Sequence, residues 1–112
     1  MKLKARIKLW LETENGYVFG EGPFNLLSEI QDLGSLSRAT KELGMSYRHA
    51  WGIIKKIEQR IGKPLLKTHK GGAPGILGGG GSELTEEAIL LMEKYLEIKE
   101  RLKGIDETFE FL

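Results

Sequence analysis

The sequence of 112 residues contains no cysteine, only two histidines and only three prolines. The absence of cysteine excludes disulfides, thiolate metal sites and cysteine nucleophiles. The histidines, His49 and His69, have no acidic residue beside them in the pattern of a catalytic triad or a metal site. We therefore expect neither an enzyme nor a bound cofactor or metal.

Long apolar runs are also missing. No segment approaches the length that a membrane-spanning helix needs. Residues 1–6 alternate polar and apolar side chains, whereas a signal peptide has a continuous apolar centre. These absences predict a cytoplasmic protein without a membrane partner. The length predicts one domain, residues 1–112.

Charge is distributed unevenly along a chain whose net charge is only +1. Residues 34–70 hold nine lysines and arginines and two acidic residues, whereas residues 82–112 hold nine acidic and four basic residues. A basic segment of this kind attracts phosphate groups, so residues 34–70 are expected to face a nucleic acid.

The basic segment contains two short helical patterns separated by a glycine. Ser35 and Ser46 are suitable N-caps, and Gly44 suits the left-handed end of the first helix. The second pattern, residues 46–61, has one apolar stripe and an opposite stripe that consists of Arg48, Gly52, Lys55 and Gln59. This arrangement predicts a helix-turn-helix whose second helix enters the DNA major groove. An ordinary pair of helices with solvated lysines is the alternative.

The residues before this motif complete a small core. Alternation over residues 4–12, followed by Asn15-Gly16, predicts a β-hairpin over residues 3–20. Gly22-Pro23 opens a helix with a buried stripe, and Gly34 ends it. We expect residues 22–62 to form a three-helix core.

A strand, a glycine-rich segment and a second strand are expected over residues 65–85. Residues 71–81 hold seven of the fifteen glycines. They contain no Gly-Lys-Ser/Thr, which excludes a nucleotide P-loop, and they do not follow a buried parallel strand as a dinucleotide site would. The segment predicts a wing whose Lys67, His69 and Lys70 contact DNA phosphates. A disordered linker is the alternative.

The last helix is predicted over residues 85–110, with Thr85 as its cap. Apolar residues recur there in alternating steps of four and three, which is the spacing of a coiled-coil seam. This repeat predicts homodimerisation through Leu91, Tyr95, Ile98 and Leu102. A wide core stripe is the alternative, and Gly104 is expected to end or kink the helix.

Three segments resemble the DNA-binding domain of the ModE-type molybdate-responsive regulators, themselves similar to the winged domain of LysR-type regulators. The segments are Gly34-Ser-Leu-Ser37, Met45-Ser-Tyr-Arg-His-Ala-Trp51, and the glycine run followed by Glu83-Leu-Thr-Glu-Glu87. The resemblance covers about residues 22 to 103. It implies a winged helix-turn-helix that dimerises through its terminal helices and binds a palindromic operator. It also implies that Ser46, Tyr47 and Arg48 contact bases and phosphates, and that Trp51 belongs to the core.

Two departures from this family qualify the comparison. Thr40 stands where the family usually has alanine, at the position where the two helices cross, and it is expected to fit less closely. The sequence ends at residue 112, before any molybdate-binding domain, so molybdate is not expected to bind this chain.

The sequence thus predicts a mainly α fold with small β elements: a winged helix-turn-helix with an N-terminal hairpin and a long dimerisation helix. The expected function is sequence-specific binding of double-stranded DNA by a dimeric transcription regulator. A protein–protein interaction module on the same fold is the alternative. The residues expected to contact DNA are Ser35, Ser37, Arg38, Ser46, Tyr47, Arg48, Gly52, Lys55, Lys67, His69 and Lys70.

Overall fold

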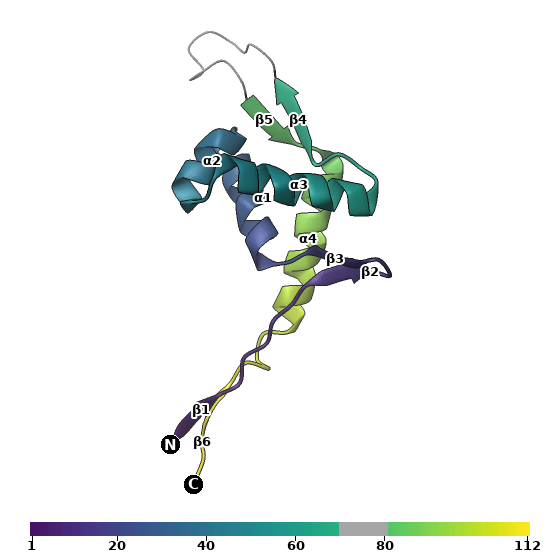
Figure 1. The fold of residues 1–112 in the computed structure, drawn as a ribbon. Helices are drawn as coiled ribbons and strands as arrows, with labels where there is room; N and C mark the ends of the chain where they lie inside the picture. The colour runs from purple at the N-terminus through teal and green to yellow at the C-terminus, as the bar shows by residue number, and fades with distance from the viewer. Residues whose placement is uncertain (70–80) are drawn as a thin grey trace.

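A computed structural model gives the fold and describes residues 1–69 and 81–112 (Figure 1). The described part contains four α-helices and three separate two-stranded antiparallel sheets. The helices are α1 (Glu21–Leu33), α2 (Leu36–Leu43), α3 (Tyr47–Ile61) and α4 (Glu86–Arg101). The sheets pair β1 (Lys2–Lys4) with β6 (Thr108–Glu110), β2 (Leu11–Thr13) with β3 (Gly16–Phe19), and β4 (Leu66–His69) with β5 (Gly81–Leu84).

The helices form the centre of the molecule, and two sheets project from it in opposite directions (Figure 1). The β4–β5 pair extends from one side of the helices. On the other side β1 and β6 form an extended terminal arm, with the two chain ends side by side at its far end.

The N-terminal hairpin is shorter than the predicted span of residues 3–20. Only β2 and β3 pair with each other, with Thr13 opposite Gly16, whereas β1 pairs with β6. Residues 5–10 lie outside any strand, although the Ala5 N–H donates to the Glu107 carbonyl at 2.7 Å. An alternating segment can pair with any available strand edge, and here the partner of β1 lies about a hundred residues away in sequence.

The three-helix core follows the predicted stripes. α1 buries Leu26, Leu27 and Ile30, and its C-cap, Gly34, has a φ of 71° that favours glycine. α2 and α3 contribute buried positions at Leu36, Ala39, Ala50, Ile54 and Ile57. The spacing of apolar residues, three or four positions apart, therefore determines which faces of the three helices pack together.

The last helix differs from the prediction in length and in role. α4 ends at Arg101, nine residues before the predicted end, and Phe109 lies in β6 opposite Leu3. Gly104 has a φ of 94° and lies in the turn after the helix. Helical periodicity continued in the sequence, but pairing with β1 gives the backbone of residues 108–110 a strand partner instead.

Tyr95, predicted in a dimer seam, belongs to the core of its own chain. It is 2% exposed, packs edge-to-face against Phe19 with ring centroids 5.5 Å apart, and also contacts the Phe24 ring. Its hydroxyl donates to the Leu9 carbonyl at 3.4 Å. Leu91 is half-buried and packs against the same core, and Ile98 and Leu102 are half-buried. The core role therefore replaces the seam at Tyr95, while dimerisation through the other three residues stays a prediction.

Candidate nucleic-acid interface

Backbone and capping hydrogen bonds form the starts of α2 and α3 and the turn between them. The Ser35 hydroxyl accepts from the Arg38 N–H at 3.2 Å, and the Ser46 hydroxyl accepts from the His49 N–H at 3.0 Å. Gly44 ends α2 with a φ of 67°. Two of the three serines predicted as DNA contacts thus use their hydroxyl oxygens as N-caps, Ser35 for α2 and Ser46 for α3.

Thr40, the departure from the family pattern, fits the crossing between the two helices. Its side chain is buried, with 4% of its surface exposed, and its hydroxyl donates to the Ser37 carbonyl at 2.7 Å. Because the hydroxyl finds a partner within its own helix, its burial leaves no unpaired polar group.

The outer face of α3 is open. Arg48 and Gly52 are exposed one turn apart, and a Cβ built on Gly52 would meet no atom within 4 Å. Exposed basic side chains lie on α2, on α3 and in the segment that follows: Arg38, Lys41, Arg48, Lys55, Lys56, Lys63 and Lys67. Ser37 is exposed on α2 beside them. The face is therefore both accessible and positively charged, as phosphate binding requires.

Trp51 corrects one prediction. It was expected in the core, but it is 38% exposed, and its ring stacks on that of Tyr47, which is 52% exposed. Lys55 lies over the Trp51 ring, with Nζ 4.3 Å from the ring centroid. Trp51 is one residue beyond Ala50 on the buried stripe, so it is rotated by about 100° to the flank of the helix. That offset is the sequence signal that would have placed it at the surface.

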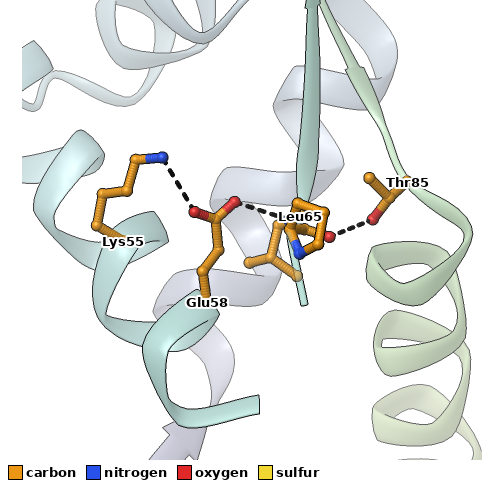
Figure 2. A network of polar contacts seen from close by, with 5 residues as sticks. Lys55, Glu58, Leu65 and Thr85 are labelled. Atoms are coloured by element: carbon orange, nitrogen blue, oxygen red, sulfur yellow. Dashed lines mark hydrogen bonds and ion pairs between the residues drawn. The ribbon is translucent and has the colours of Figure 1, made fainter. Parts of the chain in front are cut away.

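Glu58 joins α3 to the base of the β4–β5 pair (Figure 2). One carboxylate oxygen accepts from the Leu65 N–H at 2.8 Å, and the other lies 3.1 Å from Lys55 Nζ. On the far side of this segment the Thr85 hydroxyl donates to the Pro64 carbonyl at 2.7 Å. Sequence reasoning missed this link, because nothing local relates Glu58 to a residue seven positions away.

A second link holds the β2–β3 turn against α3. Arg60 Nη1 donates to the Asn15 carbonyl at 2.5 Å. Sequence analysis counted Arg60 only as part of the basic segment, and no local signal connects it with the hairpin. This contact directs one basic side chain away from the open face of α3.

Two of the three phosphate contacts predicted for the wing, Lys67 and His69, lie in β4. Lys67 is exposed and stands opposite Glu83 in the strand pairing. Lys70 and the glycine-rich residues 71–80 lie outside the described residues, and the His69 side chain is likewise not described. Of these predicted contacts, the structure therefore places the side chain of Lys67 alone.

Neither a metal-binding cluster nor a membrane-spanning helix occurs within residues 1–69 and 81–112. No three histidine, aspartate or glutamate side chains come together there as a metal site. No helix in the same ranges is long and apolar enough to cross a membrane.

The sequence pattern of the bacterial regulatory helix-turn-helix proteins of the lysR family matches residues 24–88, more than half of the chain. The fold resembles the crystal structure of ArgP from Mycobacterium tuberculosis, with a TM-score of 0.52 and 18% identity over 72% of this chain and 27% of that one. The chain therefore belongs to the lysR family of regulatory helix-turn-helix proteins, and this match covers α2, α3 and the β4–β5 pair.

Relatives within the family are ModE proteins. The molybdenum transport protein ModE of Herbaspirillum seropedicae is 35% identical over 70% of this chain and 28% of its own length. The transcriptional regulator ModE of Haemophilus influenzae is 37% identical over 62% and 26%. The DNA-binding transcriptional dual regulator ModE of Escherichia coli K12 is 31% identical over 83% and 34%.

The chain thus spans about a third or less of the length of these relatives. The Haemophilus influenzae and Escherichia coli proteins are named as transcription regulators, and the chain is a ModE-like helix-turn-helix domain of the lysR family of regulatory proteins.

Proposed function

We propose that the chain binds double-stranded DNA sequence-specifically as a dimeric transcription regulator, with α3 in the major groove. The observation that carries this proposal is the open face of α3, where Arg48 and Gly52 are exposed amid basic side chains. Arginine can donate two hydrogen bonds to guanine O6 and N7. Glycine one turn further on lets the helix backbone approach the base edges.

The β4–β5 pair acts as the wing in this proposal. Glu58 and Thr85 fix its base against α3 and α4, so the wing keeps a set angle to the recognition helix. Lys67, His69 and Lys70 then contact phosphates that flank the major-groove site, as do Ser35, Ser37 and Arg38 on the α2 side. Phosphate contacts of this kind position the protein and carry no base information.

Dimerisation is proposed to use the terminal arm, because Tyr95 of the predicted helix seam is buried within its own chain. In the arm, Leu3 lies opposite Phe109, and the Phe111 N–H donates to the Met1 carbonyl at 2.9 Å. These four side chains share one apolar face, on which Leu3 is 37% and Phe109 43% exposed. The polar residues Lys2, Lys4, Thr108 and Glu110 alternate with them on the other face.

A second copy of the chain is the occupant that fits this face. A two-stranded ribbon is marginally stable in water unless its apolar side packs against something. In a two-fold dimer the same patch meets itself, so an uncharged face is self-complementary without any need to pair charges. The arm extends away from the wing (Figure 1), so dimerisation there leaves α3 free for DNA. A two-fold dimer would bind a palindromic operator.

The proposed function places the protein in the cytoplasm with the chromosome. The names of several relatives refer to molybdenum. We propose that this chain supplies DNA binding and does not itself bind molybdate, because the matched segment is the helix-turn-helix.

Selection of duplexes from genomic fragments by the purified protein, followed by footprinting, tests the proposed function. We expect a palindromic footprint and an affinity that falls steeply with rising salt, because bound phosphates release counterions. A protein that retards no duplex at low salt, while it captures protein partners, would instead be an interaction module.

A further inference from the structure

The wing-side flank of α3 carries an aromatic pair at the surface of the molecule. Tyr47 and Trp51 lie one turn apart, with ring planes 9° from parallel and centroids 6.4 Å apart. Lys55 covers the next position, with Nζ 4.3 Å from the Trp51 centroid, and is itself held by Glu58 at 3.1 Å. Four successive positions of one flank are thus joined to each other by side-chain contacts.

This pair is not part of the core. The buried face of α3 consists of Ala50, Ile54 and Ile57, whereas Tyr47 and Trp51 are 52% and 38% exposed. Stacking and the lysine above the ring hold the indole in place before any partner arrives, so little side-chain entropy remains to be lost on binding. Exposed apolar side chains grouped in this way mark a binding surface.

The flank lies beside the open face, on the side of the helix that faces the wing. Arg48 and Gly52 define the open face. At the C-terminal end of the flank, the Glu58 carboxylate accepts a hydrogen bond from the Leu65 N–H at the start of the wing (Figure 2). With α3 in the major groove, the two rings therefore meet the groove floor or wall between the bases read by Arg48 and the backbone held by the wing.

The major groove offers one apolar group to such a surface. Thymine alone among the four bases carries a C5-methyl there, while the other groups on the base edges are hydrogen-bond donors and acceptors. The Trp51 ring face is at most a weak acceptor for those polar groups, whereas it can cover a methyl group in full contact. The Lys55 ammonium group contacts both the Trp51 ring and the Glu58 carboxylate, so it lies along the flank.

We propose that Trp51, positioned by Tyr47 and Lys55, reads the C5-methyl group of a thymine and is a specificity-determining residue of this domain. The inference rests on the proposed function. It specifies one base that the protein recognises, which is a thymine next to the base pair contacted by Arg48 in each half-site.

Methyl deletion in the DNA tests the inference. In a duplex selected by the wild-type protein, each thymine is replaced in turn by deoxyuridine, which lacks only the methyl group. We expect wild-type affinity to fall about fourfold at one thymine per half-site, which corresponds to about 0.8 kcal/mol for one buried methyl. Trp51→Ala should bind the thymine duplex more weakly and should no longer distinguish thymine from deoxyuridine at that position.

Three further variants keep the test decisive. Trp51→Phe retains a ring face and should retain part of the methyl sensitivity, even if Trp51→Ala proves unstable. Arg48→Ala should lose guanine discrimination yet keep the response to deoxyuridine. Trp10→Ala removes the other tryptophan, exposed outside the helix-turn-helix, and should behave as wild type.

The outcomes separate the inference from the function on which it rests. If wild-type protein binds no duplex, the proposed function fails. If it binds specifically but no thymine responds to methyl removal, or if Trp51→Ala keeps the wild-type response, the assignment of Trp51 is wrong and the proposed function stands. Equal weakening by Trp51→Ala on every duplex, with the response intact, would mean a backbone contact.

Discussion

The Glu58 carboxylate on α3 accepts a 2.8 Å hydrogen bond from the backbone N–H of Leu65, the fully buried residue just before β4. The Glu58 side chain is itself only 15% exposed. One acidic residue therefore connects α3 with the segment that leads into β4, although each of these two elements can form from its own local sequence.

Removal of this carboxylate should destabilise the domain. Glu58→Ala leaves the buried Leu65 N–H without its partner, so we expect the free energy of unfolding to fall by about 1–3 kcal/mol. Glu58→Gln keeps one acceptor oxygen and should lose less. Urea unfolding measures both, with the exposed Glu93→Ala on α4 as control. Equal stability of Glu58→Ala and wild type would show that water replaces the carboxylate there.

The open face of α3 predicts a separation of specificity from stability. Arg48→Ala should reduce the preference for specific over random duplex by about 1–3 kcal/mol, because an arginine–guanine pair is lost. Both duplexes should be measured by fluorescence anisotropy beside the melting temperature. If Arg48→Ala unfolds the protein or keeps the specificity ratio, Arg48 is structural or bound to phosphate.

Gly52 tests how closely the helix approaches the bases. Gly52→Leu should block specific binding by bulk, while its melting temperature stays equal or rises, since leucine is about 1 kcal/mol better than glycine within a helix and the site is open. Gly52→Ala is the matched control and should retain most of the affinity. Wild-type binding by Gly52→Leu would mean that another face of α3 meets DNA.

The wing lysines should act through salt dependence. Each phosphate contact contributes about 0.9 to the slope of log affinity against log salt. Lys67→Ala should therefore lower the slope by about one, and the double variant with Lys70→Ala by nearly two, with equal weakening on all duplexes. Lys103→Ala, exposed after α4, should leave the slope unchanged. A change of operator preference in the double variant would show that these lysines read bases.

The terminal arm makes the dimer proposal testable with neighbouring substitutions. Phe109→Lys places a charge on the apolar face and should give monomers in sedimentation, with helical content unchanged. Thr108→Lys, one residue away on the polar face, should remain dimeric. Dissociation by Leu90→Lys or Leu96→Lys, exposed on α4, with Phe109→Lys still dimeric, would place the interface on that helix.

The buried tyrosine predicts a loss of stability in alkali. Burial raises the pKa of Tyr95 above its ordinary value of 10.0, with further contributions from Glu21 and Tyr17. Because the folded state holds this proton more tightly than the unfolded state, the stabilisation is complete below about pH 10 and is lost as pH rises through the folded-state pKa. Urea unfolding between about pH 9 and pH 11 should show a shallower loss for Tyr95→Phe than for wild type. Identical slopes would mean that the hydroxyl stays solvated.

Signals that act within one turn were readable from the sequence. Ser35, Gly44 and Ser46 were predicted to bound the helices, and the structure confirms them as caps. A cap depends on a residue and the backbone of the next three or four positions, so no distant contact is needed to decide it. The stripes of α1 and α3 were readable for the same reason.

Predictions that depended on a distant partner were less successful. The alternating N-terminal segment was assigned to a hairpin, yet β1 pairs with β6. The repeat in the last helix was assigned to a second copy, yet Tyr95 packs against Phe19 and Phe24. Periodicity identifies an apolar face or a strand edge, but it does not say which surface will cover it.

The sequence by itself therefore determined the helix-turn-helix, its caps, and the basic character of the segment that carries it. Tertiary structure alone decided where α4 ends and that β1 pairs with β6 to form the arm. It also decided that Glu58 joins α3 to the segment before β4 and that Trp51 lies at the surface. The physical reason is the sequence separation of the interacting residues. Backbone caps and helical periodicity depend on neighbours in sequence. Strand pairing, the burial of a helix flank and hydrogen bonds between residues far apart in sequence depend instead on competition among all surfaces that the folded chain brings together.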